Sequence, residues 1–312
     1  MRAMNPLDLP AGTRPFTTKD AGAITAILHE AHGQGEFDGV TRHFLDSSIE
    51  RVLDEPSLAV VAEDAGRIAG WVVPVHDELT VAPAYRRRGH GRRLVTAGRR
   101  LALAMGRGEL QLWVPRRPGP EAFAGASGLA YSSSLWALRR DPSMPVTEAA
   151  FPPDLVIRAL VPGMDEPAFV DLANETFLDH PSPLVLTIEE ARRAHVRAGF
   201  DPASILLVAP AADPARLVAF CRISRHPDDT GRTVGDVRLV GVRREYRGRG
   251  LGRSLVTWGI GELLRAGVDE LELSVEGRNV GALRLYESLG FQARVEWPHW
   301  TIPAAGAEAA AG

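Results

Sequence analysis

Two glycine- and arginine-rich segments, about 160 residues apart, contain the residue types that hold phosphate groups in proteins. The first reads Arg86-Arg-Arg-Gly-His-Gly91 and the second reads Arg247-Gly-Arg-Gly-Leu-Gly252. Each follows an apolar strand pattern that ends at Val81 or Val242, and each precedes an amphipathic helix pattern. Because glycines remove side chains from the loop, consecutive backbone N–H groups can surround an anion at the positive end of the helix dipole. Both segments are therefore predicted to bind the phosphates of a cofactor.

Other phosphate-binding motifs fit these segments poorly. A dinucleotide-binding motif requires Gly-x-Gly-x-x-Gly, whereas Gly250-Leu-Gly252 continues as Arg-Ser-Leu, without a third glycine. A nucleoside-triphosphate loop requires Gly-Lys-Ser or Gly-Lys-Thr, and the only lysine in the chain is Lys19. A single Gly-x-Gly is often an ordinary strand-to-helix turn, but two copies in matching surroundings are harder to explain in that way. We therefore expect phosphates that are held and not hydrolysed.

The length indicates two domains, and the composition gives no sign of a nucleic-acid or membrane partner. With 312 residues, of which 45% are hydrophobic, the chain can bury two cores of about 150 residues each. The formal net charge of −3 argues against a nucleic-acid partner, and no apolar run approaches the roughly 20 residues of a membrane span. The single cysteine, Cys221, lies in an apolar strand pattern and is interpreted as a packing residue. The single cysteine fits a reducing cytoplasm, where we expect a monomer or a weak homodimer. We expect no metal site, because histidine and cysteine are not clustered at ligand spacings.

Both halves repeat the same order of predicted elements. For the first half the patterns predict a helix, a hairpin, a strand, a helix and a strand, at residues 17–31, 58–73, 78–81, 90–105 and 109–114. For the second half they predict a strand, two helices, a hairpin, a strand, a helix and a strand, at residues 155–160, 165–177, 187–198, 204–220, 236–242, 250–266 and 270–275. A proline-rich stretch from Asp141 to Pro153 separates the halves. We expect domains over 1–143 and 155–303, a linker over 144–154 and a flexible tail over 304–312.

A third motif identifies the family that the chain resembles. Asn279-Val-Gly-Ala-Leu-Arg-Leu-Tyr286-Glu-Ser-Leu-Gly-Phe291 is similar to the pattern Asn-x-x-Ala-x-x-x-Tyr-x-x-x-Gly-Phe of the GNAT superfamily of acyl-CoA N-acyltransferases. That superfamily also has the Arg-x-x-Gly-x-Gly loop after its fourth strand. The resemblance implies an α/β fold of two tandem GNAT-like domains, each a mostly antiparallel central sheet flanked by helices. It also implies acetyl-CoA as the cofactor.

The tandem arrangement resembles the mycothiol synthase family of two-domain GNAT enzymes. The similar segments are Phe177-Leu-Asp-His-Pro181, His226-Pro-Asp-Asp-Thr-Gly231 and Gly235-Asp-Val-Arg-Leu-Val-Gly-Val242. This resemblance implies an acceptor amine on the cysteinyl group of a cysteine-glucosamine-inositol thiol. A tandem GNAT enzyme that acetylates another aminoglycoside-like or metabolite amine is the main alternative. A non-catalytic acyl-CoA-binding protein is a second one.

Acetyl transfer to an amine requires a base for the ammonium proton and an acid for the departing thiolate. The resemblance places Tyr286 at the acid position. It places Asp236 at the base position, where the mycothiol synthase family carries a glutamate; the shorter aspartate favours base catalysis through a water molecule. Because strand side chains alternate, Asp236 and Arg238 are expected to share one face with Val240 and Val242. The alternative for Asp236 is a surface charge at a strand end.

The remaining candidates contact the cofactor or the acceptor. Asn279 is expected to cap the Tyr286 helix and to contact the cofactor, although a cap alone would explain it. The other expected cofactor contacts are Val240, Val242, Arg247, Gly248, Arg249, Gly250, Leu251, Gly252 and Arg253, with Arg86, Arg87, Arg88, Gly89, His90 and Gly91 in the first half. The acceptor is expected to meet Asp179, His180, Arg238 and Glu276. For Asp179 and His180 a helix-terminating turn is the alternative.

The first half lacks the two catalytic positions. In the counterpart of the tyrosine motif Ala124 stands where the tyrosine is expected, and Val75 stands where Asp236 is expected. The first half is therefore predicted to be non-catalytic and to bind coenzyme A or to support the fold. The domain over 155–303 is predicted to be catalytic.

Overall fold

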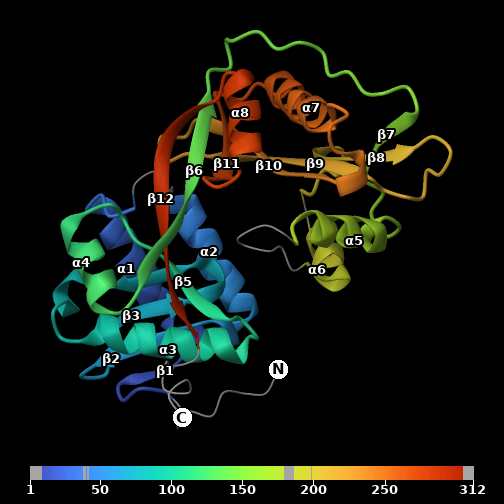
Figure 1. Ribbon diagram of the computed structural model, residues 1–312. Coiled ribbons are helices and arrows are strands. Elements are labelled where there is room, and N and C mark those ends of the chain that lie inside the picture. The colour runs from blue at the N-terminus through green and yellow to red at the C-terminus, as the bar shows by residue number, and fades with distance from the viewer. Residues whose placement is uncertain (1–8, 38–39, 41, 179–185, 198, 305–312) are drawn as a thin grey trace, which may run out of the picture. The chain divides into compact units, whose positions relative to one another are not determined.

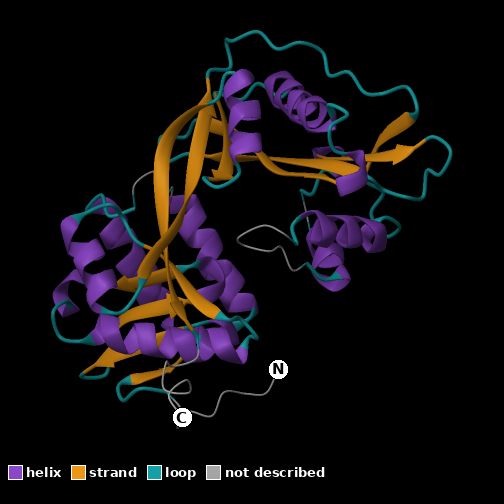
Figure 2. Ribbon diagram, in the orientation of Figure 1, coloured by secondary structure: helices purple, strands orange, loops and turns teal. Residues whose placement is uncertain are grey.

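The computed structural model describes residues 9–37, 40, 42–178, 186–197 and 199–304 (Figures 1 and 2). The chain forms two compact units, Met1–Leu135 with Val295–Gly312 and Trp136–Arg294. This division differs from a cut within the linker, because strands β6 (Ala130–Arg140) and β12 (Gln292–Pro303) each have residues in both units. A local strand pattern does not specify which sheet a strand joins. The sequence therefore does not indicate that β6 and β12 extend from one unit into the other.

The first unit contains a four-stranded antiparallel sheet in the order β1-β2-β3-β4. A fifth strand, β5, pairs with the last residues of β12. The elements are β1 (Thr13–Pro15), α1 (Ala21–Gly33), α2 (Arg42–Asp54), β2 (Val60–Asp64), β3 (Arg67–Val73), β4 (Glu78–Val81), α3 (His90–Ala104), β5 (Glu109–Trp113) and α4 (Pro118–Ala126).

The first unit has a separate core on each face of its sheet. On one face α3 packs Leu94 and Leu101 against Val72 of β3 and Leu110 of β5. On the other face α1 and α2 pack around the fully buried Trp71. Because β2 and β3 are apolar on both faces, each face requires its own helix layer.

A carboxyl group is buried beneath α2 in this second core. Glu78 accepts hydrogen bonds from Trp71 Nε1 at 2.7 Å and from Ser48 Oγ at 3.2 Å. Burial raises the pKa of Glu78 to about 7, because removing the carboxylate from water costs more than these two donors return.

We expect the Glu78→Gln variant to become more stable than the natural chain as the pH rises. The folded-state pKa of about 7 exceeds the ordinary glutamate pKa of 4.5, so the favourable contribution of Glu78 is present below 4.5 and is lost as the pH rises through 7. The relative gain for the glutamine variant is on the order of 3 kcal/mol across this range. Urea denaturation at about pH 4 and about pH 8 measures it, with the exposed Glu50→Gln as the control. A difference that does not change with pH would show that Glu78 is not protonated in the folded state.

The second unit contains the strand order β6-β11-β10-β9-β8-β7, antiparallel at β7–β8, β8–β9 and β9–β10 and parallel at β10–β11. Its elements are β7 (Leu155–Ala159), α5 (Glu166–Thr176), α6 (Ile188–His195), β8 (Ile205–Pro210), β9 (Ala219–Pro227), β10 (Thr233–Val242), α7 (Leu251–Arg265), β11 (Glu270–Glu276) and α8 (Val280–Ser288). Figure 1 shows α5 and α6 on one face of this sheet and α7 and α8 on the other.

Two apolar clusters hold the helices of the second unit onto its sheet. Leu255 and Ile260 of α7 pack with Cys221 of β9, which is fully buried as a packing residue. On the opposite face, Phe169 of α5 packs edge-to-face on Phe220 of β9, with ring centroids 5.2 Å apart. The sheet is therefore covered on both faces along β8 and β9, and its polar positions lie towards β10 and β11.

The predicted helices and strands are confirmed within a few residues at their ends, except for the second strand of the hairpin predicted over 204–220, which is observed as β9 over Ala219–Pro227. Five further elements, β1, α2, α4, β6 and β12, were not indicated by the sequence patterns. The segment Ala130-Tyr-Ser-Ser-Ser-Leu at the start of β6 has little apolar alternation, so its strand character depends on its neighbours β11 and β12.

Candidate active site

Strands β10 and β11 part at the position of the predicted base. Their parallel pairing joins Val234 to Glu270 and ends where Asp236 meets Glu272. Strand β10 nevertheless continues to Val242, paired on its other edge with β9. Beyond Asp236 the edge of β10 that faces β11 therefore has backbone groups without a strand partner, and a ligand can bond to them.

A β-bulge changes which face the later residues of β10 occupy. Val237 pairs with Ile223 and Leu239 pairs with Arg222, so Arg238 is the extra residue. Val240 and Val242 pack in the cluster beneath α7.

Asp236 instead lies on the face of Leu239, which packs in the cluster beneath α5. The prediction that Asp236 shares a face with Val240 and Val242 was therefore wrong, because it assumed regular alternation through Arg238. The predicted proximity of Asp236 to Arg238 is confirmed.

Asp236 is a buried carboxyl group with cationic neighbours. Arg238 Nη1 lies 3.2 Å from Asp236 Oδ2, and Arg222 also lies close enough to interact electrostatically. Burial raises the pKa of Asp236 above its usual range, while the positive charges of Arg238 and Arg222 oppose that rise. Glu272, its strand partner, has a pKa raised by burial and is held by Arg139 at 3.0 Å. Arg222 and Glu272 were not predicted as site residues, because strand register brings them to Asp236.

Tyr286 lies on α8 against the core of the second unit. Its ring meets Phe291 edge-to-face, with centroids 6.3 Å apart. Burial raises the pKa of Tyr286 to about 12, so the phenol keeps its proton throughout the neutral range. Its hydroxyl has no hydrogen-bond partner among the residues that the structure describes, which leaves the proton available. Asn279 caps α8, its Oδ1 accepting from Ala282 N at 3.1 Å.

The loop before α7 presents unbonded backbone donors. Gly250, with φ of +80°, precedes the helix, and no side chain caps it. The first backbone N–H groups of an α-helix have no partner within the helix, so those at Leu251, Gly252 and Arg253 point out of its positive end. Arg247 Nε donates to Val242 O at 3.1 Å, while its two Nη atoms have no partner among the described residues. This arrangement suits a phosphate.

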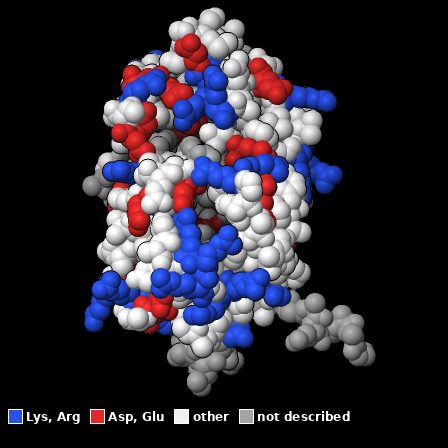
Figure 3. Space-filling view, turned by 90° about the vertical axis from the view of Figure 1, so that its left-hand side faces the viewer, with Lys and Arg blue, Asp and Glu red and all other residues white. Residues whose placement is uncertain are grey.

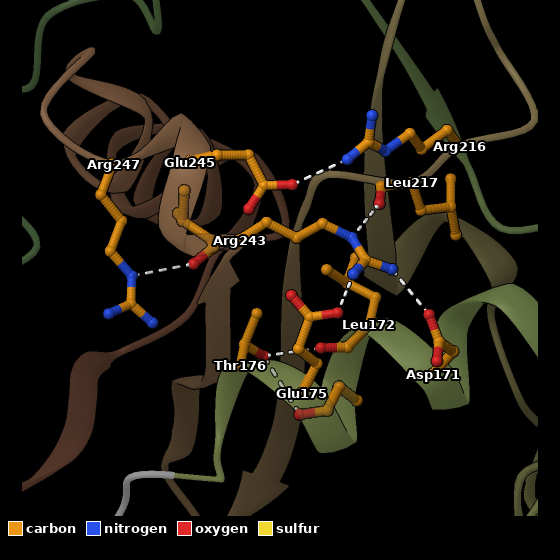
Figure 4. Close-up of polar contacts among 11 residues, drawn as sticks. Asp171, Leu172, Glu175, Thr176, Arg216, Leu217, Arg243, Glu245 and Arg247 are labelled. Atoms are coloured by element: carbon orange, nitrogen blue, oxygen red, sulfur yellow. Dashed lines mark hydrogen bonds and ion pairs between the residues drawn. The ribbon is translucent and has the colours of Figure 1, made fainter.

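Ion pairs fix this loop to the sheet and to α5 (Figure 4). Arg243 Nε donates to Leu217 O at 2.9 Å, and its Nη atoms bond Asp171, at 2.6 Å, and Glu175. Arg216 bonds Glu245 at 2.8 Å from the neighbouring strand connection. These contacts hold the loop in place, and the loop positions the backbone N–H groups at the start of α7.

The loop of the first unit has the same backbone arrangement. Arg86 Nε donates to Val81 O at 3.1 Å, and Gly89, with φ of +85°, precedes α3 without a side-chain cap. The arginine at the third position of each loop stacks on a tyrosine, with Arg88 5.6 Å from the ring centroid of Tyr85. The corresponding distance in the second unit, from Arg249 to Tyr246, is also 5.6 Å.

Contacts of the side chains distinguish the two loops. Both Nη atoms of Arg86 bond the carboxylate of Glu36, at 2.7 and 2.6 Å, whereas the Nη atoms of Arg247 carry no such pair among the described residues. Arg87 adopts a φ of +63° where the second loop has Gly248, which costs strain in a residue with a side chain. The guanidinium group of Arg86 is therefore already paired with the carboxylate of Glu36.

The second glycines of the loops also differ. A Cβ atom on Gly91 would lie 2.8 Å from the Phe123 ring, whereas one on Gly252 would meet only Leu285, at 3.6 Å. Gly91 is thus required for packing within the first unit. His90 of the same loop is buried, 3.4 Å from Asp64.

The first unit has no acid or base at the matching positions. Ala124 is buried in α4, and Val75 lies partly buried in the turn before β4. A cavity of about 140 Å³ in this unit is lined by aromatic rings and by Glu36 and Glu296. Arg86 pairs with Glu36 and Arg116 with Glu296, so this cavity offers no free carboxylate for proton transfer.

The predicted acceptor residues have mixed positions. Glu276 is 2% exposed at the end of β11, and its Oε1 has no hydrogen-bond partner among the described residues. Side chains two positions apart in a strand share a face, so Glu276 lies on the face of Glu272 and therefore of Asp236. Asp179 and His180 lie outside the described residues.

Charged side chains of both signs are interspersed on the face drawn in Figure 3. Within the described part of the chain, no helix is long and apolar enough to cross a membrane. The described histidine, cysteine and acidic residues form no group of three that would hold a metal ion.

Comparisons with known proteins identify related sequences and folds. The model of the acetyltransferase (GNAT) family matches residues 23–117 and 167–291. Mycothiol acetyltransferase of Thermobispora bispora is 33% identical over 291 residues, covering 90% of this chain and 94% of its own. That of Thermomonospora curvata is 37% identical over 278 residues, covering 86% and 90%.

Solved structures share the fold. A GCN5-related N-acetyltransferase from Sphaerobacter thermophilus matches with a TM-score of 0.64 and 24% identity over 96% of this chain and 98% of its own. A tandem GNAT protein from the clavulanic acid biosynthesis pathway matches with a TM-score of 0.55 and 22% identity, over 80% and 83%.

Proposed function

Because the chain belongs to the acetyltransferase (GNAT) family, we propose that its second unit transfers the acetyl group of acetyl-CoA to a small-molecule primary amine. The observation that carries this proposal is the combination, within one unit, of Asp236, Tyr286 and the open donor loop before α7. The first unit has Val75 and Ala124 at the matching positions, and its loop arginine is paired with Glu36.

The residues of the second unit fit acetyl-CoA, the donor of the acetyl group. The backbone N–H groups at the start of α7 would hold its pyrophosphate, together with the Nη atoms of Arg247, which have no partner among the described residues. The open edge of β10, at Val240 and Val242, would bond its amide-containing arm. Bound acetyl-CoA supplies the activated acetyl group.

The side chains of the second unit then provide proton transfer. Asp236 accepts the proton of the acceptor ammonium, directly or through water, and its positively charged neighbours favour the ionised carboxylate that this step requires. Tyr286, protonated because its pKa is about 12, donates to the thiolate that leaves. Separate groups thus perform the two transfers, from β10 and from α8.

We expect matched substitutions in the two loops to separate donor binding from stability. Gly250 and Gly89 both have a positive φ and space around the Cβ position, so valine imposes similar strain in each. Gly250→Val displaces the donor N–H groups and should raise the KM for acetyl-CoA about 10- to 100-fold, corresponding to one or two charge-assisted hydrogen bonds. Gly89→Val should leave this KM within about twofold. Steady-state kinetics and thermal denaturation of both variants test this, and an equal loss of activity would contradict a single catalytic unit.

For the acceptor, we propose the cysteinyl amine of a cysteine-glucosamine-inositol thiol, in the cytoplasm. This is supported by relatives named mycothiol acetyltransferase that match along most of both chains. Another aminoglycoside-like or metabolite amine is the alternative, because the loops that contact the acceptor differ most among proteins of one fold. A screen of acetyl-CoA consumption across amines, including this thiol, decides between them. Absence of turnover with every amine would favour a non-catalytic acyl-CoA-binding protein.

A further inference from the structure

Arg140, the last residue of β6, is buried at the end of the helix that carries Tyr286. Only 3% of its surface is exposed, and its Nε donates to the carbonyl oxygen of Leu289 at 2.9 Å. Leu289 is the C-cap of α8, three residues after Tyr286. Carbonyl groups in the last turn of an α-helix have no partner within the helix and lie at the negative end of its dipole. A guanidinium group is therefore the kind of donor that this helix end favours.

The other hydrogen bonds of Arg140 fix the chain that follows it. Its Nη1 donates to Asp141 O at 3.2 Å, and its Nη2 donates to Met144 O at 2.8 Å and to Pro145 O at 2.9 Å. Burial lowers the pKa of Arg140, but an arginine in a protein does not lose its proton, so a charged group is buried here. The bonds that offset this cost join two segments, the end of α8 and residues 141–145.

Residues 141–154, here called the strap, lie against the helices of the second unit. A Cβ atom on Gly290, in the turn after α8, would lie 2.7 Å from Met144 Cε, so Met144 packs directly on this turn. Further along the strap, Val146 and Phe151 pack against the apolar cluster beneath α7. Figure 1 shows the strap running from the end of β6 to β7. The residues predicted to form a linker are therefore packed on the second unit.

The far end of the strap contacts α7 and the loop before it. Ser254 Oγ of α7 donates to Ala150 O. Arg249 Nη2 of the loop lies 2.8 Å from both carboxylate oxygens of Asp154. One continuous segment thus joins the end of the helix that carries Tyr286 to the loop proposed to hold the pyrophosphate.

The turn that Arg140 holds also fixes Tyr286. Phe291 N donates to Tyr286 O at 3.0 Å, and the ring of Phe291 meets the ring of Tyr286 edge-to-face. A general acid must lie within hydrogen-bond reach of the atom that it protonates. Displacement by about 1 Å can reduce a rate about 100-fold. A change in the last turn of α8 would therefore be transmitted to the hydroxyl of Tyr286.

We propose that Arg140 is a positioning residue for the general acid. By holding the last turn of α8 against the strap, it fixes the hydroxyl of Tyr286 at the position from which this group protonates the leaving thiolate. This rests on the proposed acetyltransferase function. Arg140 transfers no proton itself, because its guanidinium group stays protonated, so its whole effect on turnover passes through Tyr286.

The test is a double-substitution cycle of Arg140 with Tyr286 in the full-length chain. Arg140→Gln should lower the turnover number about 10- to 100-fold, while the KM for acetyl-CoA stays within about twofold. In the Tyr286→Phe background the same substitution should change the turnover number by less than about twofold, because no acid remains to be misplaced. Steady-state rates are measured with the amine that gives the highest rate in the acetyl-CoA consumption screen. Loss of stability alone would act equally in both backgrounds.

Three further variants separate positioning from structural damage. Arg140→Lys keeps the charge but not the planar fork of donors, and it should recover part of the turnover number. Arg265→Gln is the matched control, because Arg265 ends α7, is exposed and pairs with Glu262, and this variant should keep the natural turnover number. If Arg140→Gln does not fold, Met144→Ala changes an exposed side chain, removes its contact with Gly290 and should lower turnover only when Tyr286 is present.

The outcomes distinguish this inference from the proposed function. An equal loss of turnover in the natural and the Tyr286→Phe backgrounds would overturn the positioning role and leave the acetyltransferase intact. A natural turnover number in Arg140→Gln would overturn it as well. Failure of the natural chain to acetylate any amine would contradict the proposed function itself.

Discussion

Replacing Tyr286 by phenylalanine is expected to reduce the turnover number by about 10- to 10⁴-fold, the range for loss of a general acid. The substitution keeps the ring, which packs on Phe291 and the core, and removes only the hydroxyl. The KM for acetyl-CoA should change little, because the expected pyrophosphate donors are backbone groups before α7. Steady-state rates with saturating acetyl-CoA measure the effect.

The control for this variant is Tyr131→Phe. Tyr131 is exposed in the first unit, and its hydroxyl bonds Ser134 at 3.0 Å. It should retain the natural turnover number. Because the pKa of Tyr286 is about 12, the natural rate should not fall between neutral pH and about pH 10 through loss of this proton. Natural turnover in Tyr286→Phe would exclude this tyrosine as the acid.

Replacing Asp236 by asparagine is expected to lower kcat/KM for the acceptor by about 10²- to 10⁴-fold at neutral pH. Asparagine cannot accept the ammonium proton, so only amine that is already neutral in solution can react. The rate of the variant should therefore keep rising towards the pKa of the amine. The natural enzyme should instead lose activity as the pH falls through the pKa of Asp236, which burial raises above the usual aspartate range.

Asp236→Glu is the matched control, since it retains a carboxylate at the same strand position. We expect it to keep the acid limb of the pH profile and most of the activity. Thermal denaturation confirms that the variants fold. An unchanged rate and an unchanged pH profile in Asp236→Asn would place the base elsewhere, with the buried Glu276, whose Oε1 has no partner among the described residues, as the remaining candidate carboxylate.

Local patterns in the sequence were sufficient for the parts of the site that lie on one element and its loop. Gly89 and Gly250 adopt positive φ angles directly before the two helices, and Asn279 caps the helix that carries Tyr286, as predicted. These features depend on positive φ angles, free helix N–H groups and side chains a few residues apart. The absence of an acid or base at Val75 and Ala124 is likewise visible in the residue types alone. The assignment of catalysis to the second half remains a prediction.

Only the tertiary structure decided the features that depend on pairing between distant segments. The bulge at Arg238 separates the face of Asp236 from that of Val240, because the register with β9 shifts there. The ion pair of Glu36 with Arg86 in the first loop joins residues 50 positions apart. Arg247, the matching arginine of the second loop, has no such pair among the described residues. Strands β6 and β12 have residues in both units. Arg222 is placed beside Asp236 by strand register, and register is set by the packing of two whole faces, which no local window of sequence contains.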